Sequence, residues 1–159
     1  MIEKSDRYTS ETVYLNGCLH IMGYSGVYPQ ILAVDMEGEI WRQIPCPRGS
    51  SPSIHQAQGH LCVCTVRGHN MSKLSIWILE DYCTNKWTLK HTVSILKVFA
   101  QTNIEFSYYL YYDVNEYYST VHLEWNLLLF VGVGVENDII AYNMDSKKFM
   151  SSLHVTVSF

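Results

Sequence analysis

Short runs of alternating hydrophobic and polar residues, most of them ended by glycine, proline, asparagine or aspartate, extend along most of this chain. Alternation with a period of two places successive side chains on opposite faces of a β-strand. In the first example, residues 12–15 are followed by Asn16 and Gly17 and then by residues 18–22. Because Asn-Gly readily adopts the positive backbone angles of a two-residue turn, this segment predicts a β-hairpin.

The same pattern predicts four strands in each of three successive units. The first unit has strands at residues 12–15, 18–22, 31–36 and 39–44. It ends at Pro45 and Pro47, which cannot donate a hydrogen bond to a neighbouring strand. The second unit has strands at 54–58, 60–66, 73–79 and 86–91, and the third at 118–125, 127–133, 138–143 and 148–155. Helix is scarce, and residues 94–99 predict one or two helical turns.

Equivalent residues recur at a spacing typical of β-propeller blades. The turn residues Gly17 and Gly59 lie 42 residues apart, and Trp41 lies 46 residues before Trp87. From Trp87 to Phe149 the spacing is 62 residues, which predicts an insertion at residues 93–116. Repeats of about 40–50 residues with four strands each are typical of propeller blades. The third strand of the second unit is apolar on both faces, as a strand covered by a blade on either side requires.

We therefore predict an all-β fold, a partial β-propeller of about three four-stranded antiparallel blades. The expected organisation is a polar N-terminal segment at residues 1–11 and one domain at 12–159. Within that domain the blades cover about 12–47, 54–92 and 117–157. A β-sandwich of irregular strands is the alternative, because regular strand spacing suits both architectures.

The composition narrows the classes of function. The 159-residue chain is 48% hydrophobic and 16% charged, with a net charge of −4, which describes a folded domain with a sizeable core. This acidity argues against nucleic-acid binding, which needs a basic face. Because neither a signal peptide nor an apolar run of about 20 residues is found, we expect a cytoplasmic or nuclear protein without membrane partners. An odd number of cysteines, 5, fits free thiols in a reducing compartment.

Three residues of the second unit have the chemistry of metal ligands. His60, Cys62 and Cys64 would share one face of a strand, and His69 or Cys83 could supply a fourth ligand. The paired spacing C-x₂-C of structural zinc sites is absent, however, and cysteine is among the most buried residue types. We therefore expect core cysteines and no metal.

Three short segments partly match catalytic motifs. Residues 23–26 resemble a nucleophile elbow, 122–124 a zinc-deaminase motif and 132–134 a phosphate-binding loop. Each lacks residues that its chemistry requires, and no acid–base pair can be assigned. We therefore expect no catalytic residues, no enzymatic activity and no cofactor.

Six tyrosines are the candidate partner-binding residues. They lie in the predicted insertion and beside the connection between the second and third strands: Tyr24, Tyr28, Tyr108, Tyr109, Tyr111 and Tyr112. Tyrosine offers a large amphipathic contact area and is enriched in protein interfaces. Loops on a rigid β scaffold usually carry recognition. The alternative is that these tyrosines line a strand, with alternate side chains buried and exposed to solvent.

Several segments together resemble a known protein family. Residues 12–20, 31–36, 41–45 and 59–62 carry part of the likeness, and Leu-Ser-Ile-Trp-Ile-Leu-Glu-Asp-Tyr at 74–82, followed by Lys86 and Trp87, is the most specific match. They resemble the F-box-associated, kelch-like C-terminal region of plant F-box proteins, over about residues 12–149. The resemblance implies the target-binding part of an SCF-type ubiquitin ligase receptor, in which a separate F-box docks on the Skp adaptor.

The chain departs from that family in two respects. It shows no F-box pattern, and it has about three blades, whereas closed propellers typically have four to eight. We therefore expect the C-terminal part of a longer receptor or a truncated product. Such a chain would bind an unidentified target protein but would not by itself bind the Skp adaptor. Because an open array of blades exposes apolar faces and strand edges, we also expect marginal stability or self-association.

Two further functions are weighed against the interaction domain. A small-ligand or glycan-binding β domain would stack Trp41, Trp77 or Trp87 on its ligand, so exposed tryptophans would favour it. We expect these tryptophans to be buried between blades instead. A hydrolytic propeller enzyme is disfavoured for want of an acid–base pair.

Overall fold

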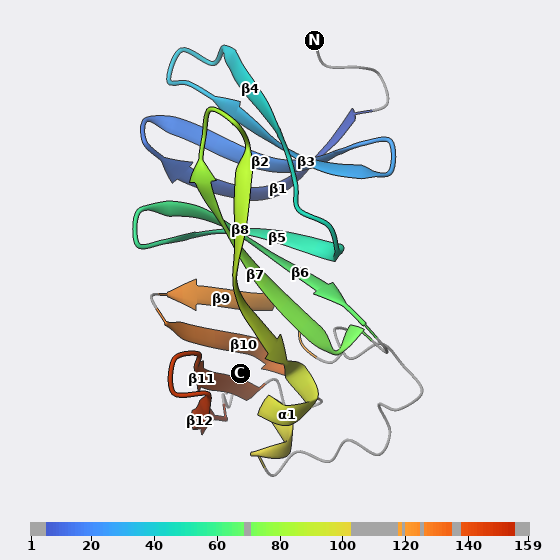
Figure 1. The fold of residues 1–159 in the computed structure, drawn as a ribbon, viewed down its shortest axis with the longest axis vertical. Coiled ribbons are helices and arrows are strands. Elements are labelled where there is room, and N and C mark those ends of the chain that lie inside the picture. The colour runs from blue at the N-terminus through green and yellow to red at the C-terminus, as the bar shows by residue number, and fades with distance from the viewer. Residues whose placement is uncertain are drawn as a thin grey trace, which may run out of the picture. The chain divides into compact units, whose positions relative to one another are not determined.

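The computed structural model describes residues 6–68, 71–102, 118, 120–124, 126–134 and 138–154, without the side chains of Asp6, Ile40, Trp41 and Thr120. Within these residues the chain forms three four-stranded sheets and one short helix (Figure 1). The prediction of an all-β fold, a partial propeller with three four-stranded antiparallel blades, is confirmed at the level of these sheets.

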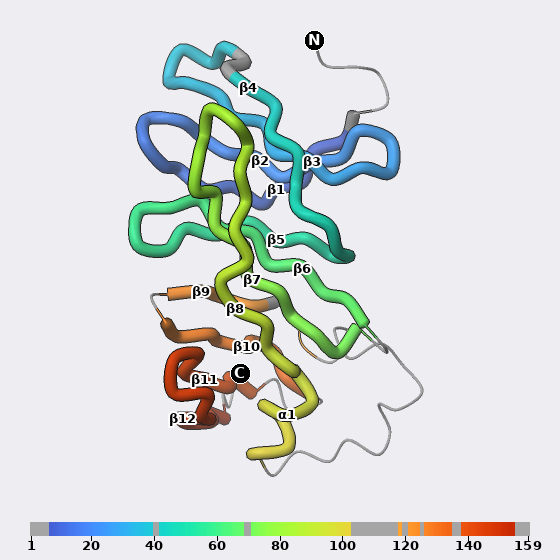
Figure 2. Tube along the Cα trace, in the orientation of Figure 1, coloured from blue at the N-terminus to red at the C-terminus, as the bar shows by residue number. Residues whose placement is uncertain are grey.

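The strands follow the chain in order. Sheet 1 contains β1 (Asp6–Leu15), β2 (Cys18–Ser25), β3 (Tyr28–Val34) and β4 (Ile40–Pro45). Sheet 2 contains β5 (Ser50–Ala57), β6 (His60–Arg67), β7 (Lys73–Asp81) and β8 (Lys86–Ser94). Helix α1 (Ile95–Ala100) follows, and sheet 3 contains β9 (Thr120–Glu124), β10 (Leu127–Val133), β11 (Asp138–Asn143) and β12 (Lys148–Leu153). Sequence neighbours pair side by side in each sheet, which is the connectivity of a propeller blade (Figure 2).

The residues that the sequence aligns occupy equivalent places. Trp41, Trp87 and Phe149 are each the second residue of the fourth strand of their sheet. Asn16 and Gly17 have positive φ of 53° and 76°, and the matching turn of sheet 2 has Gln58 at 51° and Gly59 at 74°. Positive φ at both central residues is the requirement of a two-residue hairpin turn. The four-stranded sheets are therefore structural repeats.

A further repeated position lies at the end of the third strand, or directly after it, in every sheet. Asp35, Asp81 and Asn143 each lie six residues before the fourth-strand aromatic residue. In all three, Oδ1 accepts hydrogen bonds from following main-chain N–H groups at 2.8–3.1 Å. This Asx turn replaces main-chain partners that are lost where the strand ends. Strand patterning alone does not reveal this repeat.

The first strand is longer than the sequence predicts. β1 begins at Asp6, within the segment 1–11 that was assigned to a polar N-terminus, and Asp6 pairs with Ser25. Polar residues are compatible with a strand here, because pairing with β2 satisfies the main chain. A bulge between Tyr8 and Thr12 shifts the register of that pairing.

Two compact units divide the chain. Unit 1 comprises residues 1–65 and 76–90, and unit 2 comprises 66–75 and 91–159. The core of unit 1 draws apolar side chains from sheets 1 and 2: Leu15, Met22, Ile31, Ile44, Ile54, Leu61, Val63 and Leu79. Burial of such side chains stabilises the unit by roughly 1.5–3 kcal/mol each relative to exposure.

Unit 2 has its own aromatic core. Phe99 of α1 and Phe130 of β10 are fully buried, with ring centroids 5.2 Å apart in an edge-to-face arrangement. Tyr118 packs edge-on against Phe130 at 5.2 Å. The hydroxyl of Ser94 caps α1 by accepting from the Lys97 main-chain N–H at 3.4 Å. The helical turns predicted at 94–99 are thereby confirmed.

β1 lies so close to Gly23 of β2 that there is no room for a larger side chain at this position. A Cβ at this position would lie 2.4 Å from Cδ1 of Tyr8 and 2.6 Å from the carbonyl oxygen of Arg7. We expect Gly23→Ala to lower the free energy of unfolding by about 1–3 kcal/mol, because the strand must shift to admit the methyl group. Urea denaturation measures the change. Ser25→Ala, on the same strand, is the control and should have little effect; equal midpoints for the two variants would contradict the packing.

Candidate interaction surface

The β2–β3 hairpin presents two apolar side chains at its tip. Ser25 pairs with Tyr28, so Gly26 and Val27 form a two-residue turn, and Gly26 has a φ of 61°. Val27 is 80% exposed and Tyr28 is 75% exposed. We call Gly26, Val27 and Tyr28 the hairpin tip.

Arg7 of β1 braces this tip. Its Nη2 donates to the carbonyl oxygen of Gly26 at 3.3 Å, and its guanidinium carbon lies 5.7 Å from the centre of the Tyr24 ring. Tyr24 is half-buried and pairs with Pro29 within the hairpin ladder. These two contacts connect β1 to the hairpin beside its tip.

The predicted binding tyrosines therefore have different places in the fold. Tyr28 lies exposed at the start of β3, whereas Tyr24 lies in β2 beside Arg7 and not in a loop. Tyr108, Tyr109, Tyr111 and Tyr112 lie outside the described residues. The sequence reasoning placed a binding loop at residues 24–28 but did not name Val27, whose 80% exposure only the structure shows.

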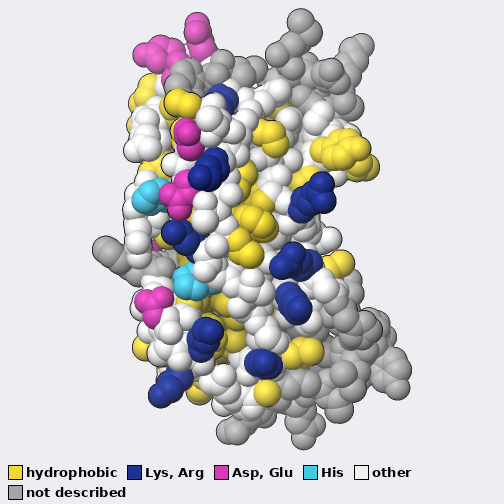
Figure 3. All heavy atoms as spheres, viewed as in Figure 1, with side chains coloured by type: hydrophobic (Ala, Val, Ile, Leu, Met, Phe, Trp, Pro, Cys, Tyr) yellow, Lys and Arg dark blue, Asp and Glu magenta, His cyan; other side chains and the backbone are white. Residues whose placement is uncertain are grey.

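Exposed apolar side chains also occur elsewhere in the described part of the chain. They are Tyr14, Leu19, Met36, Leu89, Met150 and Leu153. In Figure 3, hydrophobic side chains appear at several places on the visible face, interspersed with those of Lys and Arg. Isolated exposed apolar residues are normal on protein surfaces, so their arrangement matters more than their number.

Buried polar contacts join sheets 1 and 2 within unit 1. His20 is fully buried; its Nδ1 lies 3.3 Å from the carbonyl oxygen of Val13, and its Nε2 is hydrogen-bonded to the Tyr82 hydroxyl. Because the carbonyl can only accept, Nδ1 carries the proton and Nε2 accepts from Tyr82. Arg42 packs 5.6 Å from the Tyr82 ring centre and donates to the Cys83 carbonyl oxygen at 3.2 Å.

Burial governs the protonation of His20. Its pKa is lowered, chiefly because the buried ring loses the hydration of its charged form, while main-chain hydrogen bonds oppose the shift. His20 is therefore neutral at neutral pH and acts as a structural link between the sheets.

The tryptophans are partly enclosed. Trp77 and Trp87 are half-buried, a lesser burial than the sequence predicted. Trp77 Nε1 donates to Thr65 Oγ1 at 3.2 Å, and Trp87 Nε1 donates to the Pro45 carbonyl oxygen at 2.8 Å. Both indole N–H groups therefore have hydrogen-bond partners inside unit 1.

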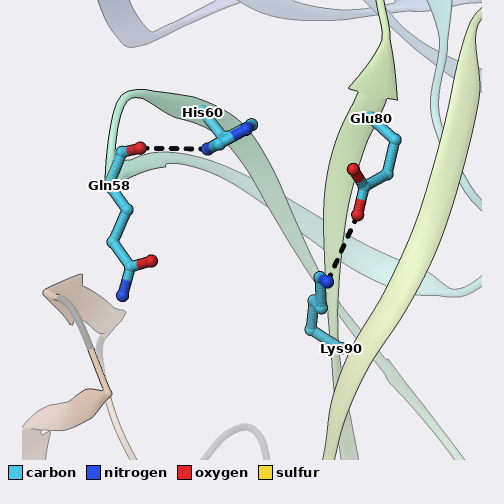
Figure 4. Close-up of polar contacts among 4 residues, drawn as sticks. All are labelled: Gln58, His60, Glu80 and Lys90. Atoms are coloured by element: carbon cyan, nitrogen blue, oxygen red, sulfur yellow. Dashed lines mark hydrogen bonds and ion pairs between the residues drawn. The ribbon is translucent and has the colours of Figure 1, made fainter.

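The cysteines of β6 lie in the core as predicted. Cys62 and Cys64 are buried, and burial raises the pKa of Cys62 to about 11. His60 is exposed, and its Nδ1 lies 2.9 Å from the Gln58 carbonyl oxygen (Figure 4). No group of three or more His, Cys, Asp or Glu residues able to hold a metal ion occurs in the described ranges.

One cross-strand ion pair lies on the surface of sheet 2. Lys90 Nζ of β8 and Glu80 Oε1 of β7 are 3.2 Å apart, and both side chains are well exposed (Figure 4). Exposed pairs of this kind contribute about 0–1 kcal/mol. The pair therefore adds little to stability and marks no site.

Comparison with known proteins gives a distant structural likeness. No protein-family model matches the chain, and no curated protein matches it. A solved structure that does match is the β-propeller domain of the Trilobed protease from Pyrococcus furiosus, described as having an open velcro topology. The TM-score is 0.45 and the identity 11%, over 94% of this chain and 43% of that chain. This chain thus covers less than half the length of that structure.

Among the described residues, no helix has the length and apolar character needed to cross a membrane.

The neutral, buried His20 predicts a stability that depends on pH. Protonation is favoured in the unfolded chain, so the stabilisation is complete above the ordinary pKa of 6.5 and is lost as the pH falls below it. His20→Gln should lower stability at neutral pH by about 1–3 kcal/mol but flatten its decline toward about pH 5. Urea midpoints across this range measure both effects.

A comparison of the two proteins isolates His20 from other groups. Burial raises the pKa of Glu11, so this carboxyl shifts stability in the opposite direction, favouring the folded state on acidification. Its contribution is common to the wild type and the variant and cancels in their difference. Parallel pH profiles would refute the assignment to His20.

Proposed function

We propose that this chain is a protein-interaction domain that contacts its partner through the hairpin tip. The observation that carries the proposal is the exposure of Val27 and Tyr28, 80% and 75%, on a turn braced by Arg7. Tyrosine held on a firm turn loses little conformational entropy when it binds, so its contact area converts efficiently into affinity. Successive four-stranded sheets supply the scaffold that such a turn requires.

The finer proposal is that the partner is a target for ubiquitin ligation. Its support is the sequence resemblance to the kelch-like region of plant F-box proteins. The most specific segment of that resemblance, residues 74–82, covers β7 and the start of the following turn, where Asp81 forms an Asx turn and Tyr82 meets His20. These residues belong to the scaffold, so the resemblance supports a shared framework. The exposed turns would then determine which target is bound.

A tip variant tests the interaction. Val27→Asp combined with Tyr28→Ala removes the apolar contact without altering the core, so capture of partners from a lysate should fall by roughly tenfold or more. Quantitative mass spectrometry of the captured proteins measures the loss. Met36→Asp is the matched control, because Met36 is 74% exposed in another turn of sheet 1, between β3 and β4. Equal retention by all three proteins, or equal loss in both variants, would reject the tip as the binding surface.

A separate test addresses the ligase role. Fusion of an F-box to the N-terminus of this chain should bring a captured protein to a reconstituted SCF ligase, and that protein should be ubiquitinated. The unfused chain should give no modification above background. If the fusion assembles with the Skp adaptor and holds the captured protein yet leaves it unmodified, the receptor proposal fails while the interaction proposal stands.

A further inference from the structure

Equivalent residues of the three sheets differ sharply in exposure. The second residue of the second strand is leucine in every sheet: Leu19, Leu61 and Leu128. Leu61 is 1% exposed and Leu128 is 0% exposed, but Leu19 is 38% exposed. Two residues later the same contrast recurs, since Ile21 is only half-buried while its equivalents in sheets 2 and 3 are fully buried. One face of sheet 1 therefore lacks the cover that the equivalent faces have.

The strand register extends this open face across sheet 1. Leu19 pairs with Tyr14 on one side and Val34 on the other, and Ile21 pairs with Leu32. Side chains of directly paired residues project to the same face. Leu32 is only 5% exposed and is already covered, so the open residues are Tyr14, Leu19, Ile21 and Val34, which we call the leading face.

Sheet 3 is less completely covered on the opposite face. The third residue of the second strand is fully buried as His20 and Cys62 in sheets 1 and 2, but it is half-buried as Leu129 in sheet 3. Val131 is likewise half-buried, whereas its equivalents Met22 and Cys64 are each 1% exposed.

Register again shows how far this second open face extends. Leu129 pairs with Ala141, Val131 pairs with Ile139, and Ile139 pairs in turn with Leu153. We call Leu129, Val131, Ile139, Ala141 and Leu153 the trailing face. All five residues are apolar.

Unit 1 shows how two such faces fit together. There the face of sheet 1 that carries Met22 packs against the face of sheet 2 that carries Leu61 and Val63. Met22 is the equivalent of Val131 on the trailing face, and Leu61 is the equivalent of Leu19 on the leading face. The two uncovered faces are thus the same two kinds of surface that are already joined between sheets 1 and 2. Twisted sheets of one sequence repeat offer each other matching shapes.

We propose that the trailing face of this chain binds the leading face of a second copy. The contact repeats between chains the packing that joins sheets 1 and 2 within one chain, and it removes both apolar faces from water. Because two different faces meet, the association is head-to-tail. The hairpin tip takes no part in this argument, so the inference is independent of the proposed function.

The oligomeric state of the full chain tests the proposal. Light scattering after size exclusion should give a mass of two or more chains for the wild type, increasing with concentration. Leu19→Glu and Leu129→Glu should each give monomers, because each places a carboxylate in the centre of one face. Leu89→Glu is the matched control: Leu89, on β8, is 40% exposed, close to the 38% of Leu19, and lies on neither face. Its mass should equal that of the wild type, and all variants should keep the wild-type circular dichroism.

A mixture distinguishes head-to-tail pairing from other contacts. Equal amounts of the two monomeric variants should form 1:1 dimers, since the intact trailing face of one chain meets the intact leading face of the other. Pairing of like faces would instead leave one variant dimeric by itself, which overturns the proposal. A wild type that stays monomeric at the highest concentration reached overturns it too, because the faces would then be stable in water or closed within one chain.

Discussion

Sheets whose central strands are apolar on both faces need cover on both faces, and the rest of this structure depends on that constraint. In unit 1, Met22 of sheet 1 and Leu61 and Val63 of sheet 2 meet in one buried cluster. No strand of either sheet could remain in place alone, since a single four-stranded sheet of this composition would leave an apolar face in water. Stacking is thus the source of stability, as in other repeat architectures.

Apolar contact alone does not fix how one sheet lies on the next, and the polar contacts of unit 1 supply this information. Glu11 lies within the bulge of β1, and its Oε1 accepts from the main-chain N–H of Ile54 at 2.7 Å. His20 meets Tyr82, and Trp87 donates to the Pro45 carbonyl oxygen at 2.8 Å. A slipped register would lose several of these hydrogen bonds at once, and the loss would be most costly at the buried His20.

The sequence predicts what local chemistry controls. Asn16-Gly17 determines a turn by its backbone preference, and the spacing of Trp41, Trp87 and Phe149 reveals the repeat. Exposure follows no local rule: Leu19 and Leu61 have the same place in their sheets, yet neighbours in space leave one open and bury the other. For the same reason the alternation around Tyr24 and Tyr28 could not show that Arg7, distant in sequence, lies against one and leaves the other exposed.

The sequence repeat distinguishes residues that build the sheets from residues that are free to differ between sheets. Residues that recur at equivalent places, such as Asp35, Asp81 and Asn143, perform the same structural task in each sheet and cannot distinguish one partner from another. In the proposed interaction domain, partner choice would therefore lie in residues that the repeat does not constrain, such as the exposed Val27 and Tyr28. A scaffold that takes its stability from stacking can vary such turns freely, because their side chains contribute little to the core.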